Sequence, residues 1–396
     1  MTLAFSITLA LAAVYYAALI GYFAVGFRRV RQETRVAIEG RVEPKPFVSV
    51  VVAARDEADG IEACLQSIFA NDYPAGRFEV IVVDDFSEDE TAAIVRRLQR
   101  SAHRVLAGVD DEVDGEDPPL RLVQMVDVAE AATGHKRHAL ARGIDQARGS
   151  LILTTDADCA VGPRWIDAMT ASFTADTGFV AGPVRYRPGR SLFGHLQALE
   201  FLALVATGAG GIGMGRPNMC NSANVAYRKE LYQQFATGEH VTNPGDDEVL
   251  AQRLAAETPG SVRFCAAPSA LVETNPVLNL RAFWAQRRRW AGTGPRYPHL
   301  GLVTAIVGVY LFYVLLLAGL VAVWLMPMLW PVVAFAMGLK IAAETTLLYP
   351  ACVHFGQQRL FRYFLPEQLV QIPYVVFVGV AGALGKTHWK GRTVFR

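Results

Sequence analysis

Residues 151–159 read Leu-Ile-Leu-Thr-Thr-Asp-Ala-Asp-Cys, an apolar run that ends in two carboxylates. A short run of β-forming residues is typical of a buried strand. In open α/β sheets, ligands bind outside the carboxyl ends of the strands. Asp156 and Asp158 are therefore expected beside a ligand, and two carboxylates suit a divalent cation such as Mg²⁺ together with phosphate oxygens. The alternative interpretation is a solvated turn that follows a strand.

Similar apolar runs and helical patterns alternate along the chain on both sides of this stretch. Continuous apolar runs are expected for parallel strands that are covered on both faces. The expected strands are residues 47–54, 78–83, 120–126, 151–155 and 179–186. The expected helices are residues 61–69, 90–104, 134–147 and 191–206. This alternation predicts an α/β fold with a Rossmann-like, mostly parallel sheet.

The composition indicates a membrane protein. The chain has 396 residues, of which 52% are hydrophobic, a high share for a purely soluble protein. The formal net charge of +1 argues against a nucleic-acid partner. The five cysteines are scattered without a CxxC spacing, which indicates reduced thiols in a cytoplasmic compartment and gives no signal for zinc.

The first segment that is long enough to cross a bilayer is residues 3–27, which carry no charge. We interpret residues 1–30 as a retained transmembrane anchor, because the run is too long for the core of a cleaved signal. Arginines follow at positions 28, 29, 31 and 35, so the positive-inside rule places the next segment in the cytoplasm. We therefore expect an integral protein of the cell inner membrane with its soluble domain in the cytoplasm.

Residues 301–396 are expected to form a C-terminal transmembrane region of two to three spans with a basic tail. Residues 302–330 carry no charge and predict one long tilted span. Residues 331–350 are apolar apart from Lys340 and Glu344, which stand one helical turn apart and can form a pair. Such a pair inside a membrane is a functional-site hypothesis, and a pair near the interface is the alternative.

The third apolar segment, residues 368–385, creates a problem of parity. Three full spans after a cytoplasmic domain would leave the basic tail outside, against the positive-inside rule. Either the rule fails here or one segment does not cross fully. Our candidate for the segment that does not cross is this third one, because it is short and Pro373 interrupts it.

Three other stretches stand out by composition. Residues 107–120 are rich in acids and predict a solvated loop with no assigned chemistry. Residues 208–215 are rich in glycine and fit either a mobile gate or a plain loop, of which we favour the loop. Residues 277–298 are expected to form an amphipathic helix at a membrane interface, because residues 277–291 combine four arginines with leucines and tryptophans.

Taken together, these features resemble the membrane-bound inverting glycosyltransferases of family two, which have a GT-A fold and include cellulose and hyaluronan synthases and ceramide glucosyltransferase. Five motifs occur in the order of that family, namely Arg55-Asp-Glu57, Asp84-Asp85, Asp156-Ala-Asp158, Gly245-Asp-Asp247 and Gln286-Arg-Arg-Arg-Trp290. The resemblance covers residues 47–295 and implies a GT-A domain at residues 44–276. The chain departs from the family at Ala53, Asp56 and Ser222, where proline, asparagine and glycine are usual.

The resemblance implies a role for each motif. The implied nucleotide-binding residues are Ala53, Arg55, Glu57, Asp84, Asp85, Lys136 and Asp156. The implied ligands of Mg²⁺ or Mn²⁺ are Asp156 and Asp158, and the implied catalytic base is Asp247. The residues implied to contact the diphosphate or the acceptor are Gln286, Arg289 and Trp290. Possible roles in acceptor binding or gating fall to Asn221, Asn224 and Asp246.

Physical chemistry supports the same roles. Displacement of a nucleoside diphosphate at an anomeric carbon needs its developing charge neutralised by a metal and by cations such as Lys136 and Arg289. The acceptor hydroxyl needs a general base, which is typically worth about 10² to 10⁴ in rate. Plainer interpretations stay open: a solvated basic turn for Lys136, helix capping for Asp247 and an interface anchor for Trp290.

Our leading hypothesis is an inverting enzyme that moves a single sugar from a UDP-sugar to a lipid acceptor in the bilayer, on the cytoplasmic face. A processive polysaccharide synthase is the second hypothesis, although such relatives use more spans to build a channel. A noncatalytic membrane scaffold is the third, and the retained motif residues argue against it. The identity of the sugar and of the lipid depends on pocket contacts that motif spacing does not contain.

Overall fold

The computed structural model describes residues 2–39, 44–107, 119–125, 136–236, 246–291, 300–384, 387–389 and 392–394. The chain forms two compact units. The sheet unit comprises residues 28–186 and 211–275, and the helical unit comprises residues 1–27, 187–210 and 276–396. Residues 187–210, which lie inside the predicted domain at 44–276, thus group with the helical unit.

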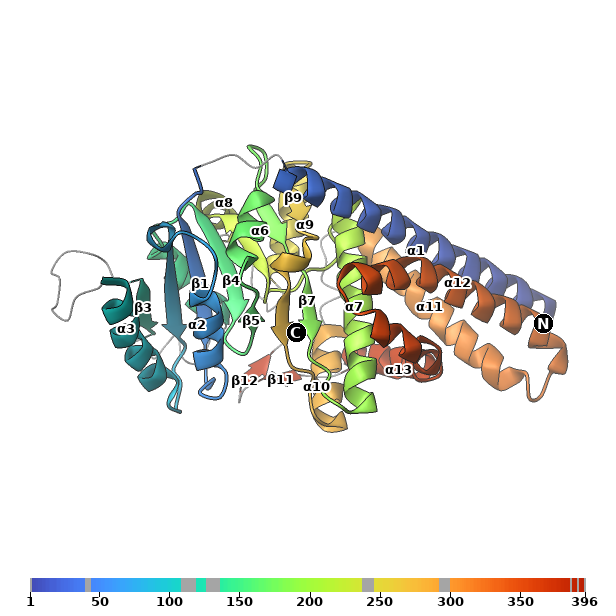
Figure 1. Cartoon of the computed structure of the whole chain (residues 1–396). Helices are drawn as coiled ribbons and strands as arrows, with labels where there is room; N and C mark the ends of the chain where they lie inside the picture. The colour runs from blue at the N-terminus through green and yellow to red at the C-terminus, as the bar shows by residue number, and fades with distance from the viewer. Residues whose placement is uncertain are drawn as a thin grey trace. The chain divides into compact units, whose positions relative to one another are not determined.

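The sheet unit is built on a seven-stranded mixed sheet in the order β3-β2-β1-β4-β8-β6-β9 (Figure 1). Its strands are β1 Val48–Ala54, β2 Phe78–Asp84, β3 Leu120–Gln124, β4 Leu151–Asp156, β6 Phe179–Ala181, β8 Val225–Arg228 and β9 Val262–Phe264. The first four strands in spatial order run parallel, whereas β8 is antiparallel to both β4 and β6. A parallel-dominated α/β sheet is the predicted fold class, which is confirmed.

Helices connect these strands, and those at residues 61–69, 91–107 and 136–145 lie where the sequence pattern predicts helices. They are α2 Ile61–Phe69, α3 Thr91–Ala107, α5 Lys136–Asp145, α6 Trp165–Ala171, α8 Lys229–Ala236 and α9 Asp246–Glu257, with 3-10 turns at Ala75–Arg77 and Pro268–Ala270. Helix α2 shows the principle, since its buried residues Ile61, Cys64, Leu65 and Ile68 share one face. Parts of the predicted loop at 107–120 and of the predicted helix at 134–147 lie outside the described residues.

The single strand predicted at residues 179–186 is wrong. The segment forms β6 and then β7 Val184–Tyr186, which belongs to a separate three-stranded sheet with β5 Ala160–Val161 and β10 Val272–Thr274. The break falls at Gly182-Pro183, because proline has no N–H for a ladder bond. A Cβ at Gly182 would lie 2.4 Å from the side-chain nitrogen Nδ2 of Asn224, so only glycine fits at this corner.

The helical unit contains most of the long apolar helices (Figure 1). Its elements are α1 Thr2–Glu39, α7 Leu192–Gly213, α10 Leu280–Ala291, α11 Leu300–Ala322, α12 Trp330–His354, α13 Phe364–Leu384 and the short strands β11 Thr387–Trp389 and β12 Arg392–Val394. The ends of α1 and α7 belong to the sheet unit. Short 3-10 turns occur at Pro327–Leu329 and Gln358–Tyr363.

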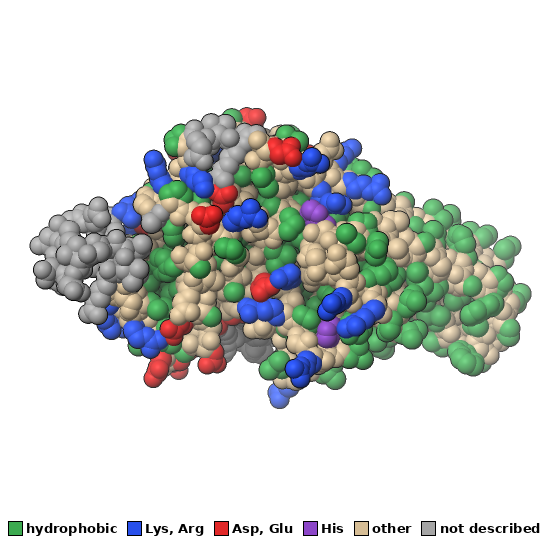
Figure 2. All heavy atoms as spheres, in the orientation of Figure 1, with side chains coloured by type: hydrophobic (Ala, Val, Ile, Leu, Met, Phe, Trp, Pro, Cys, Tyr) green, Lys and Arg blue, Asp and Glu red, His purple; other side chains and the backbone are tan. Residues whose placement is uncertain are grey.

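Five helical segments in the described residues are long and apolar enough to cross a membrane: Thr2–Glu39, Leu192–Gly213, Leu300–Ala322, Pro327–His354 and Gln358–Gly382. At the end of the helical unit that holds the start of α1 and the connection between α11 and α12, on the right of the view, Figure 2 shows hydrophobic side chains and no charged ones. Trp324 and Leu325 are 87% and 84% exposed there. Such a surface fits hydrocarbon rather than water.

A span lies within the predicted segment 302–330, at Leu300–Ala322, but its predicted length is wrong. Helix α11 ends at Ala322, and α12 begins at Trp330. Pro327 explains the interruption, because proline cannot donate its backbone nitrogen and disfavours a helical residue before it. Met326 accordingly has φ −135° and ψ 77°.

The loop favoured for residues 208–215 is also wrong, because α7 continues to Gly213. Its glycines serve close packing. A Cβ at Gly210 would lie 2.4 Å from the backbone oxygen of Phe23 on α1, and a Cβ at Gly211 would lie 2.2 Å from Asn218 Oδ1. The helix stops shortly before Gly215, whose φ of +70° suits glycine.

The predicted pairing of Lys340 with Glu344 is confirmed. Lys340 is fully buried and its Nζ lies 2.8 Å from Glu344 Oε1. Nζ also donates to Gln371 Oε1 at 2.7 Å, and Gln368 Nε2 donates to Glu344 Oε2 at 2.9 Å. These bonds join α12 to α13 through buried polar groups, as apolar surroundings require.

Candidate functional site

Three strands bring predicted site residues to one edge of the sheet. Strand β1 pairs in parallel with β2 and β4, in a register that sets Ala54 opposite Asp84 and Ala53 opposite Asp156. The carboxyl ends of these strands therefore coincide. This is the edge at which ligands bind in open α/β sheets.

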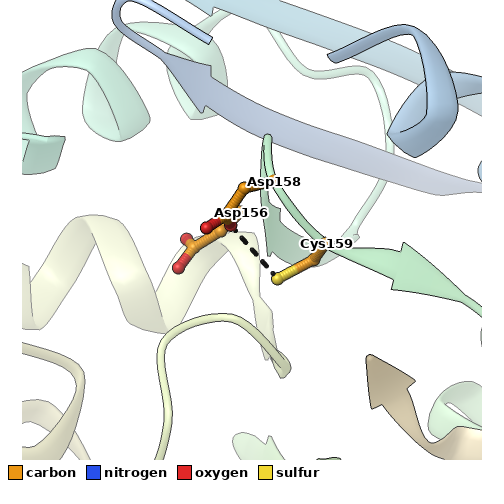
Figure 3. Close-up of side chains that lie close together, drawn as sticks. All are labelled: Asp156, Asp158 and Cys159. Atoms are coloured by element: carbon orange, nitrogen blue, oxygen red, sulfur yellow. Dashed lines mark hydrogen bonds between the residues drawn. The ribbon is translucent and has the colours of Figure 1, made fainter. Parts of the chain in front are cut away.

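Asp156, the last residue of β4, and Asp158 lie side by side (Figure 3). Ligand atoms of Asp156, Asp158 and Cys159 all lie within 4.8 Å of one another. Desolvation by the surrounding protein and the charge of Asp156 raise the pKa of Asp158 above its ordinary value. A divalent cation would relieve this repulsion between two carboxylates.

Cys159 differs from the two acids in its chemistry. Its side chain is buried, and Sγ lies 3.5 Å from Asp158 Oδ1. Burial and the two carboxylates raise the pKa of the thiol far above neutral pH. Sulfur is a soft ligand, whereas Mg²⁺ and Mn²⁺ prefer oxygen ligands. The two carboxylates are thus the fitting donors for Mg²⁺ or Mn²⁺.

Lys136 extends from the start of α5 to the carboxylate of Asp156. Its Nζ donates to Asp156 Oδ1 and, at 3.2 Å, to Ser222 Oγ. Burial opposes the charge of Lys136, but the charge and hydrogen bond of Asp156 outweigh it and raise the pKa of the lysine. Lys136 is therefore positively charged at neutral pH, beside the predicted metal ligands.

Ser222 is a member of this cluster that the sequence did not assign to the site. It lies just before β8, and its backbone oxygen accepts a bond from Thr154 Oγ1 at 3.3 Å. The antiparallel pairing of β8 with β4 brings the residue there. In the sequence, Ser222 stands out only as a serine where the family usually has glycine. Nothing in the sequence indicates its contact with Lys136.

The loops after β1 and β2 are bonded to each other. Asp56 donates its N–H to Ser87 Oγ at 3.1 Å and accepts from Glu88 N at 2.8 Å. Glu57 donates its N–H to Thr91 Oγ1 at 2.9 Å. Asp56 has a φ of +51°, which is uncommon for a residue other than glycine. The two loops predicted to hold the nucleotide thus form one fixed structure.

The predicted nucleotide residues Arg55, Asp84 and Asp85 are also connected. Arg55 Nη1 donates to the backbone oxygen of Asp85 at 3.4 Å. Asp84 is buried and its Oδ1 accepts from Ser87 N at 3.2 Å, while Gln124 Nε2 donates to its Oδ2 at 3.3 Å. These bonds fix the acidic pair at the end of β2.

Asp247 lies in the first turn of α9, which begins at Asp246. Its side chain is half-buried. The charge of Asp247 contributes to the raised pKa of Lys136, and also to the raised pKa of the thiol of Cys220. Asp247 therefore acts electrostatically on the cluster at the sheet edge. The placement of the Asp246 side chain lies outside the described residues.

The two asparagines before β8 make contacts within the protein. Asn221 Oδ1 accepts from Ala223 N at 2.9 Å. Asn224 is fully buried; its Nδ2 donates to the backbone oxygens of Pro183 and Ala270 at 2.8 Å each, and its Oδ1 accepts from Trp165 Nε1 at 2.9 Å. These bonds join the two sheets. The acceptor or gating roles of Asn221 and Asn224 stay predictions.

Gln286, Arg289 and Trp290 lie on α10 in the helical unit. The metal motif, Lys136 and Asp247 lie in the sheet unit. Gln286 Oε1 accepts from Arg287 Nη1 at 2.7 Å, and the ring of Trp290 lies 6.1 Å from that of Phe201, between centroids. The structure thus divides the predicted site residues between the two units.

Comparison with known proteins identifies the family. Residues 44–293 match the family model described as "Glycosyltransferase like family 2". The chain is 28% identical to Glycosyltransferase AglE of Haloferax volcanii over 122 residues, 31% of this chain and 34% of that protein. It is 29% identical to Beta-monoglucosyldiacylglycerol synthase of Synechocystis sp. over 261 residues, 63% of this chain and 48% of that protein.

A solved structure supports the fold. The mannosyltransferase PcManGT from Pyrobaculum calidifontis, solved with GDP-Man and Mn²⁺, matches 95% of this chain and 98% of its own, with a TM-score of 0.54 at 20% identity. At this identity the likeness concerns the fold alone. The chain spans no more than about half the length of the two curated relatives.

Proposed function

The chain belongs to the glycosyltransferase like family 2, and from this premise we propose that it transfers a single sugar from a UDP-sugar to a membrane lipid. The observation that carries the proposal is the cluster of Asp156, Asp158 and Lys136 at the carboxyl edge of the sheet, on which the charge of Asp247 also acts. This cluster combines cation ligands, a fixed positive charge and a candidate base.

The donor end of the site suits a nucleoside diphosphate. Asp156 and Asp158 would hold Mg²⁺ or Mn²⁺, which supplies charge neutralisation for a diphosphate leaving group when bound. Lys136 adds a positive charge at neutral pH. Arg289 on α10 is proposed to supply a second positive charge for the leaving group. The joined loops that contain Arg55, Glu57 and Asp84 would bind the nucleoside, for which their fixed geometry is an advantage.

The acceptor end needs a proton acceptor. We assign this role to Asp247. As the acceptor oxygen forms its bond to the anomeric carbon, the bond from that carbon to the β-phosphate oxygen breaks and UDP departs. The hydroxyl proton passes to the Asp247 carboxylate. One direct displacement inverts the anomeric centre.

A lipid acceptor is favoured by the membrane character of the chain. Five segments are long and apolar enough to cross a bilayer, and the surface over α11 and α12 is hydrophobic. The Synechocystis relative is named as the synthase of a glucosylated diacylglycerol. We further propose that the catalytic domain lies on the cytoplasmic side of the inner membrane, where the arginines after residue 27 would place it.

The proposal is tested by following labelled sugar. The protein in native membranes is incubated with labelled UDP-sugars and GDP-mannose, with Mg²⁺ or Mn²⁺, and products are divided into lipid-soluble and insoluble fractions. Label in the lipid fraction that disappears with a chelator supports the proposal. Label only in insoluble polymer would instead support a polysaccharide synthase, and no transfer with any donor would support a scaffold.

A further inference from the structure

Arg287 on α10 differs from its neighbours in the helix. Its side chain is 2% exposed, and among the twelve residues of α10, all of which the structure describes, only Arg287 is buried. Leu280 and Trp284 on the same helix are 72% and 40% exposed. Most helices pack through a buried apolar stripe. Helix α10 instead inserts a charged side chain into the helical unit.

Glu200 on α7 is the partner of this side chain. Arg287 Nη2 donates to Glu200 Oε2 at 2.6 Å, and Nε lies 3.1 Å from both carboxylate oxygens. Tyr374 on α13 donates its hydroxyl to Glu200 Oε1 at 2.8 Å. Three helices, α7, α10 and α13, thus meet at one carboxylate inside the helical unit.

The same guanidinium holds two members of the predicted Gln-x-x-Arg-Trp motif. Its Nη1 donates to Gln286 Oε1 at 2.7 Å. Its centre lies 4.2 Å from the ring of Trp290 and 4.7 Å from the ring of Phe283. These two aromatic residues follow and precede Arg287 by about one turn, so the three share a face of α10. Arg287 therefore fixes the orientation of both Gln286 and Trp290.

We propose that Arg287, Glu200 and Tyr374 are positioning residues for sugar transfer, because they hold Gln286 and Trp290 in the orientation that the acceptor step needs. The inference rests on the proposed function, with Gln286 and Trp290 assigned to the acceptor step and Arg289 to the diphosphate. The inference assigns a role to Arg287, which occupies the first unspecified position of the Gln-x-x-Arg-Trp motif. It also assigns a role to Glu200 on α7 and to Tyr374 on α13.

The chemistry of the cluster requires arginine in particular. A guanidinium can bind a carboxylate through two nitrogens, donate to an amide oxygen and stack on aromatic rings at the same time. Lysine offers a single ammonium and cannot make this set. A buried ion pair adds little net stability compared with apolar packing, so its use here is better explained by specific geometry.

The test compares Arg287→Lys with Arg281→Lys, a control on the exposed side of the same helix. Both variants are prepared as the whole chain of 396 residues in nanodiscs made from total membrane lipid, with the nucleotide sugar that the wild type uses as donor. For Arg287→Lys, kcat for transfer to lipid should fall roughly 100-fold, as expected for a misplacement of about 1 Å. The affinity for UDP should stay within about twofold, because Arg287 holds Gln286 and Trp290 and contacts none of the residues proposed to bind the nucleoside. Arg281→Lys should match the wild type.

Tyr374→Phe is the milder second variant. It removes one hydrogen bond to a charged group, and we expect a loss of about tenfold in kcat with unchanged UDP affinity. Wild-type turnover in Arg287→Lys overturns the inference, as does a parallel loss of UDP affinity and thermal stability, which would show a merely structural role. These outcomes are distinct from failure of the proposed function, in which the wild type itself transfers no sugar to lipid.

Discussion

At the scale of single residues, the cation site contains one group that resembles a ligand but lacks the chemistry. Cys159 lies beside the carboxylates, but its sulfur is a soft ligand that does not suit Mg²⁺ or Mn²⁺. We expect Cys159→Ala to leave the affinity for Mn²⁺ unchanged. Asp158→Asn should weaken it at least about tenfold, because it removes an oxygen ligand. Titration of Mn²⁺ followed by electron paramagnetic resonance measures both; equal losses would contradict the assignment.

Asp247 is the second residue with a sharp prediction. If it is the base, Asp247→Asn should lower kcat by about 10² to 10⁴ without a comparable change in the affinity for UDP. Glu257→Gln, at the exposed end of the same helix, is the matched control. Steady-state kinetics with UDP binding measured in parallel would separate the two effects. A variant with wild-type kcat would exclude Asp247 as the base.

The sequence predicted residues whose position follows from a single strand or motif. Asp156 and Asp158 are of this kind, because both directly follow an apolar run that forms β4. Ser222 and Arg287 are not. Ser222 meets Lys136 through an antiparallel pairing of distant strands, and Arg287 meets Glu200 through packing of helices that lie far apart in the sequence. No local pattern contains such contacts.

At the scale of elements, glycine misled the prediction for α7. Glycine is a poor helix former, but it also permits close approach of two helices. We expect Gly210→Ala to destabilise the protein by about 1–3 kcal/mol, because the added Cβ would overlap the backbone of Phe23. Gly21→Ala on α1 meets no atom within 4 Å and should be neutral or stabilising. Thermal unfolding in detergent compares them; equal midpoints would contradict the packing account.

Most strands of the sheet, unlike the end of α7, were predicted correctly. The strands β1, β2 and β4 were predicted because each corresponds to a largely continuous apolar run in the sequence, and the structure buries nearly all of these residues. The error at residues 179–186 arose because β6 and β7 both bury most of their residues and only Gly182-Pro183 separates them. Hydrophobicity predicts that a segment is buried, but it does not predict which of two sheets receives it.

At the scale of the whole molecule, the side of the membrane that holds the basic tail is a testable consequence. Helix α13 contains Pro373 and bonds through Tyr374 to Glu200. We propose that it does not cross fully, so that residue 396 lies in the cytoplasm as the positive-inside rule requires. A fluorescent protein that matures only in the cytoplasm, fused after residue 396, should fluoresce. The same fusion after Trp324, between α11 and α12, should not, and the reverse pattern would contradict the topology.

The central claim is transfer of one sugar to a lipid, and mass spectrometry of lipid extracts tests it most directly. Purified protein is reconstituted with lipid extracted from native membranes. It is then incubated with a panel of UDP-sugars and Mg²⁺ or Mn²⁺, with Asp247→Asn as the inactive control. The account predicts a lipid that gains the mass of a single sugar only with the wild type, which identifies donor and acceptor together. Release of UDP with polymeric carbohydrate and no new glycolipid would contradict it.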